Sequence, residues 1–352
     1  MSIKVSKKLK VGIAGFGVVG QRRRHYIDKH PALETVAVCD NVFGKDINSI
    51  IGLRCYKNYQ SLLKEPLDLL FVSLPNYLAP EVTIGGLESG MHVFCEKPPG
   101  IDVSDIERVY QVKLKYPKLQ LKYGFNHRYH YSVKDALKLI NSGELGEIIS
   151  LRGVYGKSSL VPFDGSWRSE RKYSGGGILL DQGIHMLDLM RYLSGEDFSE
   201  IFSFIDNAFW NFDVEDNAYV LMKSQTGVVA QLHSSATQWR HLFNLEITME
   251  KGSLILGGLL TGSKSYGAET LTVVSANPEG DKGDPKEVTT RYNTDPSWYA
   301  EIKEFVDCIL KNRKVINGSS NDALQTMKLV YKIYYADKKW RQAYDIKDPD
   351  TE

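Results

Sequence analysis

The chain has 352 residues, of which 42% are hydrophobic and 25% charged, and its formal net charge is +1. This length exceeds one ordinary core, so we expect two or three domains of a globular protein. A net charge near zero, without a long basic block, argues against nucleic acid or an anionic membrane as a partner.

Up to about Asn126, short apolar runs alternate with segments of helical character. This alternation predicts a parallel sheet built from βαβ units. The predicted strands cover residues 10–14, 35–39, 67–73, 92–95 and 120–125. The predicted helices between them cover residues 20–29, 59–64, 79–89 and 103–116.

The first predicted strand runs into a Gly-x-Gly-x-x-Gly turn made by Gly15, Gly17 and Gly20. Gly15 permits the tight turn, Gly17 lets backbone amides approach a pyrophosphate, and Gly20 lets the next helix pack on the strand. Asp40 closes the second strand, where its carboxylate would bind ribose hydroxyls and repel a 2′-phosphate. This order predicts a dinucleotide site that prefers NAD, although Asn41 leaves NADP possible. A plain strand–helix turn is the alternative.

Two more polar segments follow predicted strands. The Pro75-Asn76 turn after the third strand should flank the nicotinamide, because ligands of such sheets lie beyond the carboxyl ends of the strands; a turn that only starts a helix is the alternative. Glu96 and Lys97 follow the fourth strand and precede two prolines, so a cis Lys97–Pro98 bond is compatible with this sequence. A lysine in a closed cleft orients a hydroxyl and stabilises negative charge, whereas a lone lysine is more often solvated.

The pattern changes from Ile148 onward, after a helix predicted over residues 132–141. Short β-rich runs separated by tight turns predict an antiparallel sheet. These runs cover residues 148–155, 200–210, 217–223, 228–235, 243–250 and 253–256. An exposed loop is predicted over 277–286, and helices over 298–311 and 321–340.

The expected fold class is therefore α/β with two domains. Residues 1–126 should form a doubly wound Rossmann domain that binds a dinucleotide. Residues 127–352 should form an α+β domain for substrate binding and oligomerisation, with a large, mostly antiparallel open sheet. The C-terminal helices could pack back on the first domain.

Asp181, His185 and Asp188 lie at i, i+4 and i+7 of a predicted helix that follows three glycines. Ionisable groups on an otherwise apolar face are costly unless they are used or paired. His185 can move a proton near neutral pH, and Asp181 could tune it or hold a substrate hydroxyl. A hydrogen-bonded structural histidine is the main alternative. A metal site is disfavoured, because these residues supply too few ligands.

With these segments in order, the chain resembles the glucose-fructose oxidoreductase / inositol dehydrogenase / rhizopine-catabolism (Gfo/Idh/MocA) family of NAD(P)-dependent oxidoreductases. The resemblance covers nearly the whole chain from Val11, and its most specific marks are Glu96-Lys97-Pro98 and the Gly-Gly-Gly-x-Leu-Leu-Asp-x-Gly-x-His segment of residues 175–185. It departs from the family at Ala79, where many members carry a histidine.

The resemblance implies which residues act. Lys97, Asp181 and His185 would be catalytic, with His185 accepting the proton. The expected cofactor-binding residues are Gly15, Phe16, Gly17, Val18, Val19, Gly20, Asp40, Leu74, Asn76, Glu96, Lys97 and Asn126. The expected substrate-binding residues are Lys97, Arg128, Trp167, Arg168, Asp181 and His185, and no metal is expected.

The predicted reaction is hydride transfer between nicotinamide and a secondary alcohol or ketone of a sugar. Residues 167–193 and 214–218 look most like family members that act on nucleotide-activated sugars for surface glycans. A free polyol or inositol dehydrogenase and a non-catalytic NAD-binding sensor are the alternatives. We expect a homodimer or homotetramer through the second sheet. The reason is that this sheet carries more large apolar side chains than one core-facing side needs, namely Phe202, Phe204, Phe209 and Trp210.

The remaining features concern the compartment. The four cysteines are scattered, so we expect them to be reduced. Residues 1–10 lack the apolar core of a signal peptide, and no apolar run is long enough to cross a bilayer. These features predict a cytoplasmic protein.

Overall fold

The computed structural model describes residues 8–44, 52–161, 166–262, 265–280 and 283–351. Residues 1–7 of the N-terminal segment and 281–282 of the predicted loop lie outside the described residues. The described chain divides into two compact units. The first takes its residues from Met1–Phe125, Lys172–Ser174 and Trp298–Gln325, and the second from Asn126–Arg171, Gly175–Ser297 and Thr326–Glu352.

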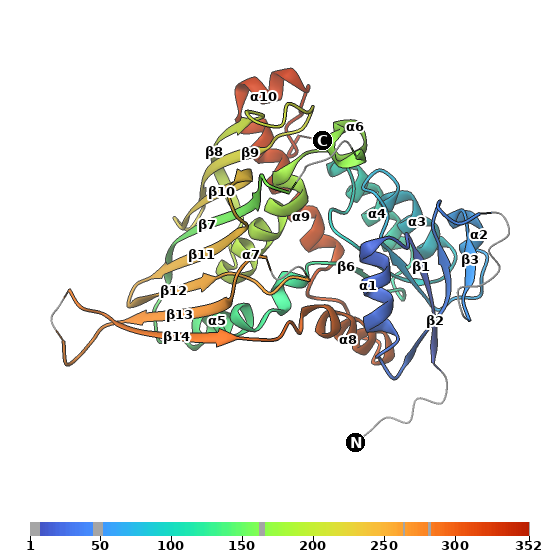
Figure 1. Ribbon diagram of the computed structural model, residues 1–352, viewed down its shortest axis with the longest axis horizontal. Coiled ribbons are helices and arrows are strands. Elements are labelled where there is room, and N and C mark those ends of the chain that lie inside the picture. Colours follow the sequence, from blue (N-terminus) through green and yellow to red (C-terminus); the bar gives the residue numbers. More distant parts are fainter. Residues whose placement is uncertain (1–7, 45–51, 162–165, 263–264, 281–282, 352) are drawn as a thin grey trace. The chain divides into compact units, whose positions relative to one another are not determined.

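The first unit is built around a parallel sheet whose described strands follow the order β3-β2-β1-β4-β5-β6 (Figure 1). This is the doubly wound order, which reverses between β1 and β4. These two strands pair directly, with Ala14 opposite Val72, so the segments that follow them leave the sheet at the same edge. The strands are β1 (Leu9–Ala14), β2 (Leu33–Cys39), β3 (Arg54–Tyr56), β4 (Leu69–Val72), β5 (His92–Cys95) and β6 (Leu121–Tyr123).

Helices from both ends of the chain complete this unit. Phe305 of α8 packs on Phe94 of β5 with ring centroids 5.8 Å apart, and Ile302 and Val306 join the same core. A C-terminal helix is therefore part of the first unit's hydrophobic core. The helices are α1 (Val18–Ile27), α2 (Tyr59–Leu62), α3 (Ala79–Glu88), α4 (Val103–Lys115) and α8 (Ser297–Leu310).

The second unit contains a larger sheet, with the described strands in the order β14-β13-β12-β11-β7-β10-β9-β8 (Figure 1). Neighbouring strands are antiparallel except β7 and β10, which are parallel. The strands are β7 (Ile148–Ser158), β8 (Phe198–Asp206), β9 (Asn217–Ser224), β10 (Val229–Gln238), β11 (Leu242–Met249), β12 (Gly252–Gly257), β13 (Glu269–Ser275) and β14 (Lys286–Tyr292). The α/β fold class predicted from the sequence is confirmed.

One face of this sheet is covered by helices. Helix α5 contacts β12 and β13, and α7 contacts β7 and β10. Along β9, buried and exposed residues alternate, so among the described residues one face of this strand is buried and the other is exposed. The remaining elements are η1 (Asn126–Tyr129), α5 (Tyr131–Ser142), η2 (Trp167–Ser169), α6 (Arg171–Ser174), η3 (Leu179–Gly183), α7 (Ile184–Ser194), α9 (Ser320–Ala336) and α10 (Lys338–Ala343).

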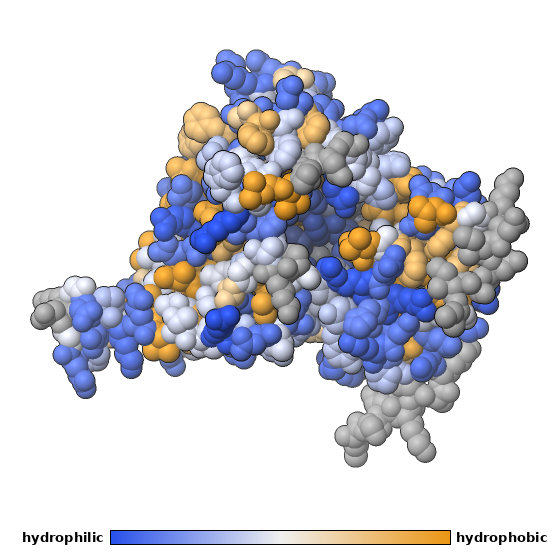
Figure 2. Space-filling view, in the orientation of Figure 1, coloured by the Kyte–Doolittle hydropathy of each residue, from blue (hydrophilic) through white to orange (hydrophobic). Residues whose placement is uncertain are grey.

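Three details differ from the sequence-based expectation. Strands β3, β13 and β14 were not predicted. The residues of β14 are nearly all exposed, and the part of the surface that contains this strand is mostly hydrophilic (Figure 2), so the strand has no apolar alternation from which it could have been predicted. The strand predicted to reach Trp210 ends at Asp206. The last predicted helix is two helices, because Asp337 accepts a hydrogen bond from the Trp340 amide (2.9 Å) and caps α10.

The described part of the chain contains no helix with the length and apolar character needed to cross a membrane.

Candidate active site

The turn between β1 and α1 constrains its three glycines in different ways. Gly15 has φ = +86°, and a Cβ there would clash with the carbonyl of Ser73, which follows β4. A Cβ on Gly20 would clash with the Gly15 carbonyl. A Cβ on Gly17 would instead meet no described atom within 4 Å, and Gly17 begins α1 without a capping side chain. Open space at a helix N-terminus fits a pyrophosphate.

Asp40 lies at the end of β2, beside this turn. Its Oδ2 accepts a hydrogen bond from the Phe16 amide (2.7 Å), and its Oδ1 accepts one from the Val42 amide (3.2 Å). Because each carboxylate oxygen accepts more than one hydrogen bond, these contacts leave capacity for ribose hydroxyls. Val18 is 76% exposed on the first turn of α1, whereas Phe16 is buried. The residues present therefore fit NAD.

The Asn76 turn follows β4 at the same sheet edge. The Asn76 side chain is buried, and its Nδ2 donates to the backbone oxygen of Ser174 (2.7 Å). Leu74 is half-buried, and Ala79 begins α3. One amide hydrogen of Asn76 is therefore used in a hydrogen bond within the first unit.

Glu96 and Lys97 follow β5, and Lys97 is half-buried with a cis bond to Pro98. Beside them, Arg23 of α1 is fully buried between the rings of Phe94 and Trp298, at 4.4 and 4.3 Å from their centroids. Its Nε donates to Glu96 Oε1 at 2.5 Å. The guanidinium therefore fixes the residue that directly precedes Lys97.

A second carboxylate completes this charged cluster. Nη2 of Arg23 forms an ion pair with Glu301 Oε2 of α8 at 2.8 Å. Burial alone would lower the pKa of Arg23, but Glu96 and Glu301 raise it above its ordinary value. Burial raises the pKa of Glu301 to about 7, against the opposing effects of Arg23 and Lys122. We did not predict Arg23 or Glu301, since neither has a local sequence signal.

The segment that carries Asp181 and His185 is not one continuous α-helix. Asp181 lies in η3, a π-helical turn, and the α-helix begins only at Ile184. The predicted i, i+4, i+7 spacing on one α-helical face is therefore wrong for Asp181, because a π-turn widens the repeat. Asp181 is half-buried, whereas His185 and Asp188 are buried.

A buried carboxylate holds the start of this segment. Glu215 accepts hydrogen bonds from the amides of Gly177 (2.7 Å) and Leu179 (3.0 Å), and from the Tyr334 hydroxyl (2.7 Å). A Cβ on Gly177 would clash with the Glu215 backbone, which explains the glycine at this position. Burial raises the pKa of Glu215, and the Tyr334 hydrogen bond opposes this effect. The Gly-Gly-Gly signature therefore serves close packing here.

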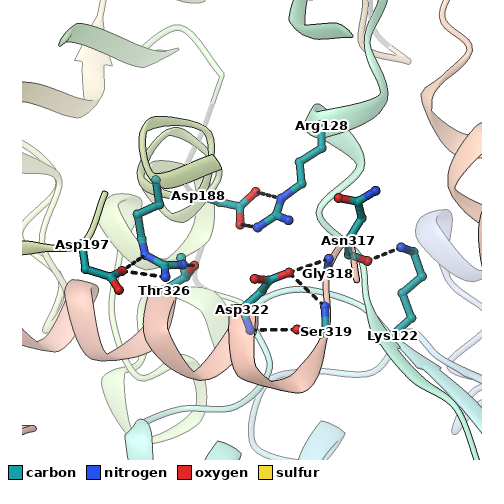
Figure 3. Close-up of polar contacts among 10 residues, drawn as sticks. Lys122, Arg128, Asp188, Asp197, Asn317, Gly318, Ser319, Asp322 and Thr326 are labelled. Atoms are coloured by element: carbon teal, nitrogen blue, oxygen red, sulfur yellow. Dashed lines mark hydrogen bonds and ion pairs between the residues drawn. The ribbon is translucent and has the colours of Figure 1, made fainter. Parts of the chain in front are cut away.

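Two residues of η1 contact α7. The His127 ring stacks on the His185 ring, with centroids 3.8 Å apart and planes 12° apart. Arg128 donates from Nε and Nη2 to the two carboxylate oxygens of Asp188, at 2.8 and 2.6 Å (Figure 3). The structure thus places Arg128, predicted at the substrate, in a buried bidentate ion pair that ties η1 to α7.

The other predicted residues of the second unit lie in separate environments. Asn126 donates from Nδ2 to Ser297 Oγ (3.1 Å). Trp167 is half-buried in η2, and the guanidinium of the exposed Arg168 lies over its ring, 4.4 Å from the centroid.

Comparison with known proteins shows the family. Residues 9–123 match the model of an oxidoreductase family with an NAD-binding Rossmann fold, and residues 133–255 match the GFO/IDH/MocA C-terminal domain. The chain belongs to the Gfo/Idh/MocA family. It is therefore an oxidoreductase, and its first unit is the NAD-binding domain.

Individual members of the family are moderately similar. Inositol 2-dehydrogenase of Salmonella paratyphi B is 26% identical over 253 residues, covering 69% of this chain and 72% of that enzyme. The 1,5-anhydro-D-fructose reductase of Ensifer adhaerens is 29% identical over 262 residues, 72% of each chain. A solved levoglucosan dehydrogenase in complex with NADH has a TM-score of 0.83 at 20% identity, covering 95% of this chain and 98% of that one, and so shows the fold.

Proposed function

We propose that this family member transfers a hydride between NAD and a secondary alcohol or ketone of a free sugar or polyol. The observation that carries the proposal is Lys97 at the carboxyl end of β5 in an NAD-binding sheet, directly after a glutamate held by Arg23. Relatives named inositol 2-dehydrogenase and 1,5-anhydro-D-fructose reductase support a substrate of this chemical class.

Each proposed catalytic residue has one task. Lys97 donates a hydrogen bond to the reacting oxygen and stabilises its negative charge as the proton leaves. His185 accepts that proton, and Asp181 orients the histidine or a neighbouring hydroxyl. Bound NAD supplies the hydride acceptor. Trp167 and Arg168 are proposed to contact the substrate, whereas Arg128 is proposed to support η1.

The nucleotide-sugar alternative has less support. It depended in part on residues 214–218, which are all buried. Glu215 holds the amides of Gly177 and Leu179, and Asp216 accepts hydrogen bonds from the amides of Phe209 and Trp210 (2.8 and 3.0 Å). The carboxylates of this segment thus support the fold, so we prefer a free sugar or polyol.

We also propose a functional division near residue 126, with cofactor binding before it and substrate binding and self-association after it. The exposed face of β8 and β9 supports self-association. Phe202 pairs with Leu221 and Phe204 with Tyr219 across the two strands, and all four side chains are exposed. Such an apolar patch is typical of a contact with a second copy.

The substrate class can be tested with purified protein. It is mixed with NAD and, separately, with free polyols, free sugars and nucleotide sugars, and NADH absorbance is followed. The proposal predicts turnover with a free polyol or sugar. Turnover only with nucleotide sugars would show that the proposed substrate class is wrong, and NAD binding without any turnover would favour a non-catalytic sensor.

Two variants test the catalytic assignment. Lys97→Met and His185→Gln should each lower kcat by about 10²- to 10⁴-fold, because each removes a group that acts on the reacting oxygen or its proton. NAD affinity, measured by calorimetry, should change by less than about threefold. Lys118→Met, at an exposed lysine of the same unit, is the matched control. Wild-type turnover by Lys97→Met would refute the assigned role.

A further inference from the structure

His127 has no assigned role, yet its ring covers one face of the His185 ring. The two imidazoles are nearly parallel, with centroids 3.8 Å apart, and both side chains are buried. The two residues come from different elements, η1 and α7, and are 58 positions apart in sequence, counted as 185 minus 127. A stack of this kind orients both rings.

The hydrogen bonds of His127 define its protonation. Nδ1 lies 3.2 Å from Asn126 Oδ1, and Nε2 lies 3.0 Å from the Tyr155 hydroxyl. Because Asn126 donates from Nδ2 to Ser297, its oxygen faces His127 and accepts the Nδ1 proton. Burial raises the pKa of Tyr155 well above its ordinary value, so Tyr155 is a phenol that can donate to Nε2. Both nitrogens of a neutral His127 are satisfied in this way.

The segment that carries His127 is fixed on both sides. Arg128 forms its bidentate ion pair with Asp188, one turn beyond His185 on α7 (Figure 3). His130 Nδ1 lies 2.8 Å from Glu269 Oε2, and the Ser132 amide donates to Glu269 Oε1 (3.0 Å). His127 therefore cannot withdraw from His185 without breaking buried, charge-assisted contacts.

We propose that His127 is a positioning residue that presents a neutral aromatic face to His185 and thereby stabilises the His185 imidazolium. A neutral ring face attracts a cation, whereas a second imidazolium at this distance would repel it. The inference rests on the proposed function, in which His185 accepts the substrate proton. Among the described residues, the titratable or charged groups around the stack include Tyr155 on β7, the His130–Glu269 pair and the Arg128–Asp188 pair, and Asp181 and Tyr266 act on Tyr155 in turn.

A matched pair of variants isolates the ring face. His127→Phe keeps an aromatic face, His127→Leu removes it, and both lose the hydrogen bonds to Asn126 and Tyr155. Histidine ring signals are followed by NMR against pH in protein labelled at its eight histidines, and His185→Gln identifies the His185 signal. The pKa of His185 should lie about half a unit to one unit lower in His127→Leu than in His127→Phe.

The same variants give a kinetic readout. The acidic limb of the kcat profile should lie about half a unit to one unit lower in pH in His127→Leu than in His127→Phe, following the His185 pKa, and the kcat plateau above this limb should be lower in His127→Leu because a weaker base accepts the proton. Equal His185 titrations in two folded variants would overturn the inference. Because the NMR titration needs no substrate, it decides this inference even if no alcohol is oxidised and the proposed function fails.

Tyr155→Phe tests the protonation of His127 separately. In the wild type, the His127 signal should not titrate between about pH 5 and 8, because Tyr155 donates to Nε2. Loss of that donor should bring a His127 titration into this range. A His127 that already titrates near its ordinary pKa in the wild type would contradict the neutral face.

Discussion

Asp40 places a negative charge beside the glycine turn and also holds the turn in shape. Its two oxygens accept from the amides of Phe16 and Val42, so an alanine would remove both the charge and these contacts. The asparagine substitution separates the two effects, because the amide oxygen still accepts a hydrogen bond. Selection against NADP should depend on the charge.

We expect Asp40→Asn to raise the ratio of kcat/KM for NADP to that for NAD by at least about tenfold, which corresponds to about 1.4 kcal/mol. Steady-state kinetics with each cofactor measures the ratio. Asp68→Asn is the control, because Asp68 also accepts a backbone hydrogen bond, from Lys10 (2.7 Å), but lies before β4. An unchanged ratio in Asp40→Asn would mean that other residues select the cofactor.

At the scale of elements, α8 does more than fill the core of the first unit. It brings Glu301 to Arg23, and Glu304 of the same helix accepts a hydrogen bond from Lys122 of β6 (3.3 Å). Lys122 also donates a hydrogen bond to the backbone oxygen of Asn317 (Figure 3). Arg23 therefore faces two carboxylates, Glu96 and Glu301, in a buried cluster. Burial raises the pKa of Glu301, and the neighbouring Glu96 carboxylate raises it further against the opposing effects of Arg23 and Lys122, so the cluster favours a proton on Glu301.

This cluster makes stability depend on pH. Burial raises the folded-state pKa of Glu301 from 4.5 to about 7, so its contribution is complete below about pH 4.5 and is lost as the pH rises through 7. The loss is on the order of 3 kcal/mol. Chemical unfolding at pH 5 and 8 should show this decrease for the wild type and a smaller one for Glu301→Gln. Glu304→Gln is the control for removing one carboxylate from α8. If the free energy of unfolding decreased equally between pH 5 and 8 in Glu301→Gln and in the wild type, the explanation would be refuted.

At the scale of the molecule, apolar side chains of β8 and β9 are exposed on one face of the large sheet, where no described element covers them. Phe202 and Phe204 are 70% and 76% exposed on β8, next to Tyr219 and Leu221 on β9. Tyr219 in turn stacks on His233 of β10 with centroids 4.2 Å apart. Hydrophobic residues lie among hydrophilic ones over the visible strands of this sheet (Figure 2).

We expect the double variant Phe202→Glu and Phe204→Glu to weaken self-association at least about 100-fold, because two carboxylates would have to be desolvated in the contact. Sedimentation equilibrium of wild type and variant measures the change. Ile316→Glu is the control, since Ile316 is equally exposed but lies in the first unit. A monomeric wild type, or an unchanged association constant, would contradict the proposed contact.

Much of the fold could be predicted from local sequence patterns. Glycine spacing and apolar runs predicted β1, α1 and β2, with Asp40 at the end of the second strand. These features could be predicted because turn conformation and strand burial depend on residues that are close together in the sequence. Strand β14 escaped prediction because its residues are nearly all exposed and carry no apolar period. The break at Asp337 had a local signal, a capping residue inside a long helical pattern.

The sequence by itself determined the cofactor domain, the position of Lys97 after a buried strand, and the family. The tertiary structure alone decided which charges and rings meet: Arg23 with Glu96 and Glu301, Arg128 with Asp188, and His127 with His185. These partners come from distant segments, so their contacts follow from how sheets and helices pack rather than from any spacing along the chain. The proposed proton transfer at His185 therefore involves a neighbour that its own motif does not contain.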